Sequence, residues 1–442
     1  ELTVDAIQDD LGKRYPKHAG LYKSEAMSHP VKFYEKGKNP LEFVQTRQWF
    51  IRILPMKDTL KSRGSEIEWH PPFMEARYQN WVDGLNQDWC VSRQRFFGVP
   101  FPIWYPVDAN GQPEYQKPIF ADAAACPVDP ATDLPDGYTE DQRGQANGFI
   151  GEADVMDTWA TSSITPQLVS HWAQNPERHE KSFPFDLRPQ SHEIIRTWAF
   201  YTIVKSELHH NCIPWSHIAI SGWVLDPDRK KMSKSKGNVV TPAHLLEQYS
   251  SDAVRYWAGS AQLGTDTAVD EAVFNVGKKT VLKIFNAGKF VIQQIQNAQD
   301  CDSTSIADVT EALDQSFLVG LGQSIDDATK TFESYDYAKA LMAIETRFWD
   351  FCDQYIELSK KRAYQGEAAA AKSAIATLRI ALSVLLRLWA PFLPFITEEL
   401  WAWEFRSDET PSIHRAAWPT VEEAGNFAAI GTRAYELASQ VI

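Results

Sequence analysis

One short basic stretch has the residue types and the spacing to bind phosphate groups. Residues 229–238 read Arg-Lys-Lys-Met-Ser-Lys-Ser-Lys-Gly-Asn, which places five cations within eight residues. Lysine and serine side chains donate hydrogen bonds to phosphate oxygens, and Gly237 lets the backbone approach a ligand closely. A charge run is also typical of a solvated surface or a localisation signal. The neighbouring elements decide between these interpretations.

The basic stretch lies between a predicted strand and a predicted helix. Residues 217–225 are mostly apolar and predict a buried strand, and residues 226–229 predict a turn. Residues 242–259 predict a helix, with Thr241 as N-cap and Pro242 at its first position. The N-terminus of that helix adds positive potential beside the loop. A localisation signal has no reason to occupy this place, so we interpret the stretch as a phosphate-binding loop.

The overall composition is that of a folded protein with a net negative charge. The 442 residues include 44 Lys and Arg against 58 Asp and Glu, which gives a net charge of −14. Aromatic residues make up 12% of the chain and supply ample apolar area for a core, which excludes disorder as the main state. A protein coated in basic charge is excluded, but a local basic patch that binds a polyanion is compatible with these numbers.

Cysteine usage and hydropathy indicate the compartment. The five cysteines are far apart and contain no Cys-x-x-Cys pair, which argues against a disulfide framework or a zinc knuckle. We therefore predict a cytoplasmic protein with no structural metal. Because no uninterrupted run of about 18 apolar residues occurs, we also predict no membrane-spanning helix and no membrane partner.

The composition changes near residue 265, which divides the chain into two main regions. Residues 49–265 are rich in proline, glycine and tryptophan, which favours a mixed α/β domain, and residues 102–150 within it predict a hairpin-bearing insertion or a long loop. Residues 266–420 show apolar residues at helical spacing and predict a bundle of roughly three or four long helices. Residues 421–442 predict the start of a further unit.

Several segments resemble one enzyme family. Lys231-Met-Ser-Lys-Ser235 resembles the KMSKS loop of class I aminoacyl-tRNA synthetases. Residues 88–95 resemble the segment where the chain of these enzymes returns from the editing insertion to the catalytic core, and residues 349–357 and 391–401 resemble their anticodon-binding bundle. The resemblance implies that the α/β region is the second half of a Rossmann-type nucleotide-binding catalytic domain. An anticodon-binding helical bundle would follow it, and residues 1–48 would be the remnant of an editing domain.

The resemblance also implies roles for individual residues. ATP with Mg²⁺ would be a substrate, and the catalytic Lys231 and Lys234 would meet the growing negative charge on the departing pyrophosphate. Glu193 would take the place of the family's acidic residue that contacts the ATP ribose. The ATP-binding candidates are Lys231, Met232, Ser233, Lys234, Ser235, Glu193 and Gly222.

A further segment indicates which amino acid the enzyme would use as its substrate. Residues 154–163 resemble the valine-specific form of the family, whereas isoleucine-specific enzymes typically have Trp-Phe-Asp-Ser-Gly there. The resemblance implies a valine pocket formed by Trp159, Ile194 and Trp198, and the last two residues would share one helix face at a spacing of four. Residue patterns alone also allow the simpler interpretation that these tryptophans are core residues. An isoleucine-specific ligase remains the alternative.

The helical region contributes candidate contacts to RNA. The resemblance implies tRNA(Val), ATP and L-valine as partners of a monomeric enzyme. Basic residues of the bundle would position the RNA through its phosphates, and the interaction should weaken with salt. A solvated helix face is the alternative interpretation for each of them. The tRNA-binding candidates are Lys278, Lys279, Lys283, Arg347, Lys360, Lys361 and Arg362.

Both ends of the chain indicate a fragment of a longer protein. The first residue is Glu1 rather than Met, and Ile442 lies inside an apolar periodic stretch. The His-Ile-Gly-His stretch of the family does not occur in the sequence. We therefore expect the chain alone not to form valyl-adenylate, because the phosphates lack their second set of donors. A non-catalytic tRNA-binding derivative of such an enzyme is the remaining alternative.

Overall fold

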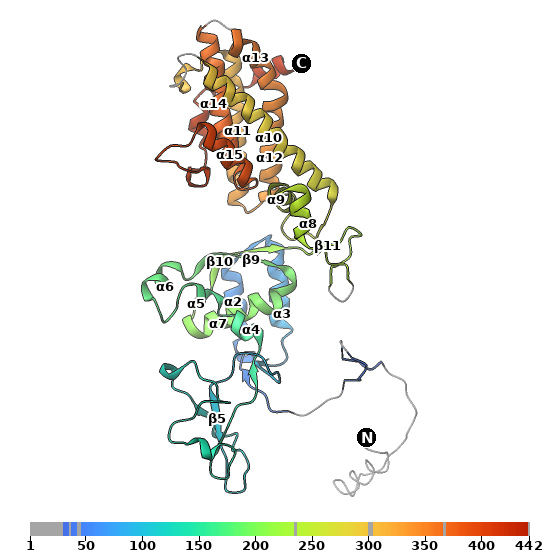
Figure 1. Ribbon diagram of the computed structural model, residues 1–442, viewed down its shortest axis with the longest axis vertical. Coiled ribbons are helices and arrows are strands. Elements are labelled where there is room, and N and C mark those ends of the chain that lie inside the picture. Colours follow the sequence, from blue (N-terminus) through green and yellow to red (C-terminus); the bar gives the residue numbers. More distant parts are fainter. Residues whose placement is uncertain are drawn as a thin grey trace. The chain divides into compact units, whose positions relative to one another are not determined.

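The computed structural model describes residues 30–34, 37–41, 46–233, 237–298, 304–365 and 368–440. The chain divides into two units, Glu1–Trp49 and Phe50–Ile442. Figure 1 labels the main helices and strands of the second unit. In the described part of the first unit, Phe33 and Pro40 form an antiparallel bridge. The elements below belong to the second unit.

A three-stranded parallel sheet organises the α/β region. Its strands are β2 (Glu68–His70), β10 (Trp215–Ser221) and β9 (Phe185–Ser191), in the order β2-β10-β9. In the central strand, Ile218 pairs with Trp69 on one side and with Arg188 on the other. Because the strands are parallel, their carboxyl ends meet at one edge of the sheet. A ligand site is therefore expected at that edge.

Three helices pack together at β2. They are α2 (Lys57–Glu66), α3 (Glu75–Asp83) and α7 (Phe200–His210). Tyr78 of α3 joins them, because its fully buried ring contacts Trp69 of β2 and Phe200 of α7. The Tyr78 hydroxyl donates a hydrogen bond of 2.8 Å to the carbonyl oxygen of Leu60 in α2. Burial and this bond fix α3, which carries one wall of the site described below.

The predicted insertion at residues 102–150 contains an antiparallel sheet in the order β6-β5-β7. The strands are β5 (Ile103–Pro106), β6 (Ile119–Phe120) and β7 (Phe149–Gly151). The short antiparallel pairs are β1 (Phe50–Ile51) with β3 (Trp89–Cys90) and β4 (Ser92–Arg93) with β8 (Val155–Met156).

Short helices fill the connections of the second unit. The short α-helices are α4 (Thr158–Ser162), α5 (Thr165–Val169), α6 (Pro176–Ser182) and α16 (Arg433–Ser439). The 3-10 turns are η1 (Leu54–Met56), η2 (Pro72–Met74), η3 (Ala123–Ala125), η4 (Glu140–Gln142), η5 (His192–Ile194), η8 (Ile306–Asp308), η10 (Ile413–Arg415) and η11 (Val421–Ala424).

The strand and the helix predicted on either side of the basic loop are each divided in two. The strand ends at Ser221, and a second strand, β11 (Val224–Leu225), pairs in parallel with β12 (Thr267–Ala268). The helix predicted over residues 242–259 is in fact α8 (Pro242–Tyr249) and α9 (Ser251–Gly259). Ser250 separates them because its φ of 83° lies outside the helical region. The single-helix prediction was wrong at this point.

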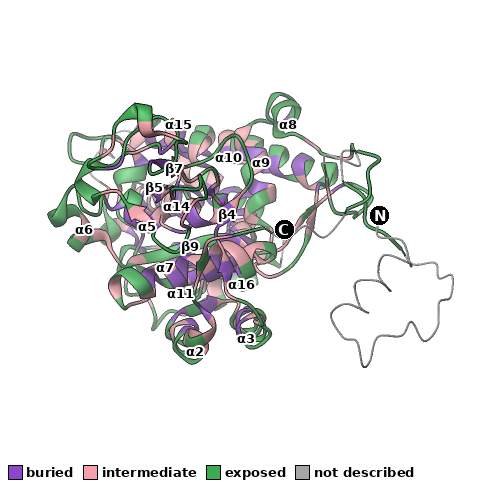
Figure 2. Ribbon diagram, turned by 90° about the horizontal axis from the view of Figure 1, so that it is seen from below, coloured by how far each residue is buried: buried purple, intermediate pink, exposed green. Residues whose placement is uncertain are grey.

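The C-terminal region is a helical bundle, as predicted, but it contains more helices than expected. Apolar residues at helical spacing meet in its interior, where Ile344, Phe351 and Leu385 are buried. Figure 2 colours the buried residues purple. A π-turn, η9 (Phe351–Tyr355), connects two of the helices. The helices are α10 (Glu271–Asn297), α11 (Ala312–Glu333), α12 (Tyr337–Asp350), α13 (Ile356–Gln365), α14 (Ala368–Trp389) and α15 (Pro394–Glu404).

Two features of the bundle bear on the sequence predictions. Among the described residues, α14 has the length and hydropathy to cross a membrane, but 61% of its apolar window is buried inside the protein, as in the core helix of a bundle. Tyr435 of α16 packs into the bundle core, and its backbone N–H donates to the Ser316 hydroxyl at 3.0 Å. The α/β region followed by an all-α region is therefore confirmed.

Candidate functional site

A pocket of about 1150 Å³ opens at the carboxyl edge of the parallel sheet. One wall follows β9, where His192 and Glu193 lie directly after the strand, and another wall is Trp223 after β10. Arg77 of α3 and Asp266 complete the polar lining. This is the edge at which parallel α/β sheets bind ligands.

Lys231 of the basic loop faces this pocket. Its Nζ atom lies 2.5 Å from Oε1 of Glu193 and 4.2 Å from the centre of the Trp223 ring, an arrangement that combines an ion pair with a cation–π contact. The Trp223 Nε1–H donates to the other Glu193 oxygen at 3.1 Å. The hydrogen bond from Lys231 lowers the pKa of Glu193. Both charged side chains remain more than 40% exposed, so a ligand can reach them.

The two ends of the basic loop are held together by polar contacts. Asp226 accepts hydrogen bonds from the backbone N–H of Lys230 and from the side-chain amide of Asn238, both at 2.7 Å. These bonds, that of Lys230 first, lower the pKa of Asp226. Asn238 in turn accepts from the Ser233 N–H at 2.9 Å. Sequence reasoning identified the turn but missed its partner Asn238, although aspartate and asparagine at loop ends are a known signal for such bonds.

The remaining loop candidates have different positions. The Met232 sulfur accepts the Val240 N–H at 3.3 Å, and the side chain packs with the apolar residues around α8 and α9. Lys234 and Ser235 lie outside the described residues. Met232 therefore anchors the loop to the helical side.

Gly222 packs behind the pocket wall. A Cβ atom at this position would overlap the backbone of Thr265, so only glycine allows the two segments to approach. The same contact is supported by the Trp223 N–H, which donates to Asp266 at 2.8 Å, and by the Gly264 N–H, which donates to Ile220 at 2.8 Å. Gly222 thus shapes the pocket by allowing the 264–266 segment to lie against the end of β10.

Sequence reasoning missed a polar chain along one side of the pocket. The Arg77 guanidinium lies 3.2 Å from Nδ1 of His192, and Nε2 of His192 lies 3.4 Å from Asp266. These residues come from α3, from the turn after β9 and from the loop before β12, and they have no common local pattern. Only the arrangement of the strands brings them together.

The three valine-pocket candidates lie on neighbouring elements. Trp159 is half-buried in α4, and the Trp198 Nε1–H donates to the carbonyl oxygen of Ser162 at the end of α4 at 3.1 Å. Ile194 ends the 3-10 turn η5, whereas Trp198 lies in a π-turn, η6 (Ile195–Ala199). Ile194 and Trp198 were predicted to share one face of an α-helix. They do not, because α7 begins only at Phe200.

Arg188 of β9 is a further residue that the sequence did not single out. Its guanidinium carbon lies 3.3 Å from the ring centre of Trp198 and 4.7 Å from that of Trp215. The residue is only 8% exposed, and burial lowers its pKa to about 10. Its Nε and Nη2 atoms have no hydrogen-bond partner in the described part of the chain. The stacking fixes the Trp198 indole in place.

The basic candidates of α10 differ in how they are engaged. Lys278 and Lys279 are exposed, and Lys278 donates to the carbonyl oxygen of Gln248 at 3.2 Å. Lys283 forms an ion pair of 2.8 Å with Asp353 and lies 5.3 Å from the Trp349 ring. Lys278 and Lys279 are thus more accessible than Lys283.

The later basic candidates are bound mainly by residues of the bundle itself. Lys360 pairs with Glu357, and Lys361 is exposed. Arg347 pairs with Asp350 at 2.6 Å. Arg362 donates two hydrogen bonds, of 2.6 and 2.7 Å, to the fully buried Asp314. Arg362 therefore belongs to an internal network of the bundle.

Comparison with known families agrees with this fold. Residues 16–270 match the family model described as tRNA synthetases class I (I, L, M and V). Residues 314–442 match the anticodon-binding domain of tRNA ligase. The chain therefore belongs to the class I tRNA synthetase family.

The curated relatives of this chain are named as ligases for valine. The valine--tRNA ligase of Thermobifida fusca (strain YX) is 55% identical over 403 residues, which cover 90% of this chain and 45% of that protein. The valine--tRNA ligase of Salinispora tropica is 52% identical over 398 residues, 89% of this chain and 46% of that protein. The chain spans a little less than half the length of these relatives.

Solved structures share the fold. A methionyl-tRNA synthetase of Mycobacterium tuberculosis in complex with methionyl-adenylate superposes with a TM-score of 0.62 at 17% identity, over 90% of this chain and 68% of that chain. The LeuRS–tRNA–LeuAMS complex of Agrobacterium radiobacter K84 gives a TM-score of 0.60 at 21% identity, over 76% of this chain and 42% of that chain. The predicted resemblance to class I synthetases is confirmed.

Proposed function

We propose that this chain supplies the second half of the catalytic site and the anticodon-binding bundle of an ATP-dependent ligase that joins L-valine to its tRNA. The observation that carries the proposal is the position of Lys231, at the carboxyl edge of a parallel sheet beside Glu193 and Trp223. The choice of valine is supported by curated relatives at 48–55% identity that are named valine--tRNA ligase.

The proposed first step forms valyl-adenylate. The valine carboxylate attacks the α-phosphorus of Mg²⁺-bound ATP, the bond to the bridging oxygen breaks, and pyrophosphate leaves with the electron pair. Lys231 exchanges its contact with Glu193 for the phosphates and stabilises the charge that grows on the leaving group. Such a contact accelerates the reaction because it strengthens in the transition state. Lys234 and Ser235 would add donors from the same loop.

Glu193 would have two roles in this cycle. Before ATP binds, it holds Lys231 at the pocket through the 2.5 Å ion pair. After Lys231 turns to the phosphates, the Glu193 carboxylate is free to accept a hydrogen bond from a ribose hydroxyl. Met232, Ser233 and Gly222 would support the site by fixing the loop base and the pocket wall.

The valine pocket would select its substrate by shape. Trp159, Ile194 and Trp198 offer apolar walls, and the contacts of Trp198 with Ser162 and Arg188 keep its indole from moving. Such a pocket excludes larger side chains but discriminates against threonine by only about a hundredfold. A separate hydrolytic editing site is then required, and residues 1–48 would be the remnant of the domain that carries it.

Recognition of tRNA(Val) would use the accessible lysines of the bundle. Lys278 and Lys279 are the best candidates for phosphate contacts, and Lys283 and Lys360 lie beside aromatic rings on which a base could stack. We assign Arg347 and Arg362 to the internal stability of the bundle. We further propose that residues 49–265 and 266–420 are separate parts of a monomeric cytoplasmic enzyme, and that residues 421–442, which pack on the bundle through Tyr435, begin a further unit.

The test is valine-dependent exchange between ATP and pyrophosphate. Because the chain spans under half of its relatives, we would join it to the remaining part of the Thermobifida fusca relative and measure the chimera. Lys231→Ala should reduce the exchange rate by about 10²–10³-fold. Lys181→Ala is the matched control, since that side chain is exposed on α6 and pairs with Glu177 outside the pocket lining, and it should change the rate little.

The other outcomes distinguish the alternatives. Exchange that depends on isoleucine instead of valine would support an isoleucine-specific ligase. Binding of tRNA without any exchange would support a non-catalytic derivative. A Lys231→Ala chimera as fast as the parent would contradict the proposed role of the loop.

A further inference from the structure

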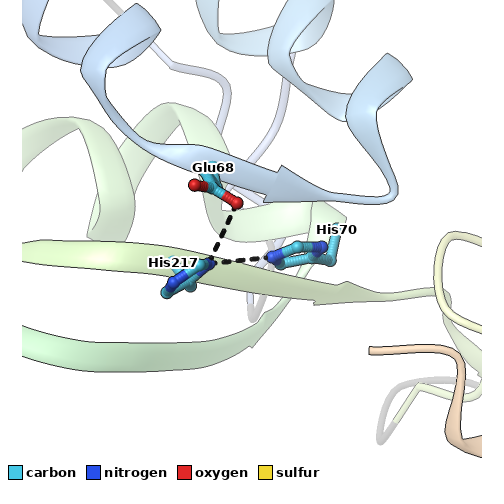
Figure 3. Close-up of side chains that lie close together, drawn as sticks. All are labelled: Glu68, His70 and His217. Carbon is cyan, nitrogen blue, oxygen red and sulfur yellow. Dashed lines mark hydrogen bonds and ion pairs between the residues drawn. The ribbon is translucent and has the colours of Figure 1, made fainter. Parts of the chain in front are cut away.

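Three side chains with metal-binding atoms lie together on one face of the parallel sheet, away from the pocket. Glu68 and His70 are two residues apart in β2, and His217 is in the neighbouring strand β10, where it pairs with Glu68. Since side chains alternate along a strand, all three point to the same face. Figure 3 shows that the Glu68 carboxylate and the two imidazoles converge on one point.

The distances between the three groups fit a small divalent ion. His70 Nε2 lies 3.1 Å from His217 Nδ1, and His217 Nδ1 lies 3.5 Å from a Glu68 oxygen. All three ligand atoms lie within 4.8 Å of one another. Zinc bonds of about 2.0–2.1 Å place the ligands of a tetrahedral site about 3.3–3.4 Å apart. The Glu68 side chain is 71% exposed, so a change of rotamer can shorten the distance from its carboxylate to His70 toward this spacing.

Ring contacts with neighbouring residues hold the His70 imidazole in place. The His70 ring stacks on Tyr335, which lies between α11 and α12, with ring centres 4.0 Å apart, and on His217 at 5.4 Å. Tyr335 has a φ of 60°, an uncommon conformation for a residue of this size. These contacts limit rotation of the His70 ring and keep its Nε2 atom directed at His217.

We propose that Glu68, His70 and His217 form a binding site for a divalent transition-metal ion of the Zn²⁺ type. Two histidines and one carboxylate suit such an ion, whereas Mg²⁺ and Ca²⁺ prefer oxygen ligands alone. Without a metal, His70 Nε2 and His217 Nδ1 form a hydrogen bond with each other; an ion between them takes the place of that bond, and each ring then carries its proton on its other nitrogen. The bound ion cross-links β2 to β10 and fixes the His70 ring, on which Tyr335 of the α11–α12 connection stacks.

Sequence analysis predicted no structural metal from the spacing of the cysteines, and it missed these three residues because they do not form a local motif. Glu68 and His70 are adjacent on one strand face, but His217 is 147 residues after His70. The register of β2 on β10 alone brings it to them. The site lies outside the ATP pocket, and it does not depend on the proposed ligase activity.

The test is a titration of the 442-residue chain with ZnCl₂ by calorimetry and with CoCl₂ by visible absorption. We expect saturable binding of one ion and a Co²⁺ absorption band typical of a four-coordinate site with nitrogen ligands. His217→Ala and Glu68→Gln should each weaken binding at least about tenfold, as loss of even an outer-sphere partner does in known sites. His244→Ala is the matched control, since that histidine is exposed on α8 and should leave binding unchanged.

A second variant guards against misfolding. His217→Asn keeps a polar side chain of smaller size, and its thermal unfolding without metal should match that of the parent chain. If this variant and Glu68→Gln bind Zn²⁺ as tightly as the parent, or if the parent shows no saturable binding, the proposed site is wrong. A Zn²⁺-dependent rise in melting temperature confined to the parent and to His244→Ala would support it.

Discussion

The pocket and the helical bundle use charged residues in opposite ways. In the bundle, Asp314 is fully buried and accepts hydrogen bonds from Arg362, Tyr355 and Ser373, at 2.6 to 2.8 Å. In the pocket, Lys231 and Glu193 pair at a similar distance but remain 43% and 45% exposed. Water competes for the pocket pair and not for the bundle network. The bundle charges therefore fix the helices, whereas the pocket charges are available for exchange with a ligand.

The two regions also differ in how glycine is used. In the pocket wall, Gly222 allows the backbone of residues 264–266 to approach the end of β10. In the bundle, Gly322 lies inside α11, and a Cβ there would meet its neighbours only at ordinary contact distances. The first glycine is required by close packing of backbone, and the second is tolerated although it weakens the helix.

Loss of the buried carboxylate in the bundle should have the largest effect on stability. Asp314→Ala leaves the Arg362 guanidinium and the Tyr355 hydroxyl without their partner, and breaking a buried pair costs about 3–5 kcal/mol. The free energy of unfolding in urea measures this loss. Asp326→Ala is the control, because its ion pair with Lys330 is exposed and its removal should change stability little. Equal effects of the two substitutions would remove the contrast between buried and exposed charges.

The two glycines should respond to alanine with opposite signs. Gly222→Ala forces the strand end away from Thr265 and should cost about 1–3 kcal/mol, as overpacking does. Gly322→Ala should stabilise the protein by about 0.5–1 kcal/mol, because alanine loses less backbone entropy in a helix. Thermal unfolding of both variants measures the difference. A stabilising Gly222→Ala would show that the pocket wall is not closely packed.

The smallest expected effect is the pH dependence of the Lys231–Glu193 pair. The folded pKa of Glu193 is lowered from its ordinary value of 4.5, chiefly by the hydrogen bond from Lys231. The pair therefore contributes fully above about pH 4.5 and is lost as the pH falls through the lowered pKa. The carboxyl resonance of Glu193, followed by NMR against pH, should titrate below the ordinary value. In Lys231→Ala it should return toward 4.5, and an unchanged midpoint would argue against the ion pair.

Local sequence patterns predicted the elements more accurately than their contacts. Apolar spacing predicted the buried faces of the bundle helices, and the turn at residues 226–229 is present, with the Arg229 N–H bonded to Asp226 at 2.9 Å. The helix predicted over residues 242–259 failed at Ser250, because a left-handed φ at one residue is not encoded by hydrophobic spacing. Hydrophobic spacing also does not encode the π-turn η6 before α7, which the sequence analysis did not predict.

Local patterns were enough to predict a basic loop between a strand and a helix, a helical C-terminal region and a family resemblance. Which side chains meet depends instead on how the elements pack. Glu193 reaches Lys231 across 38 residues, and His217 reaches His70 across 147. Helical and strand periodicities describe one element at a time, whereas these contacts depend on the register of β9 and β2 on β10 and on the loops that follow the strands.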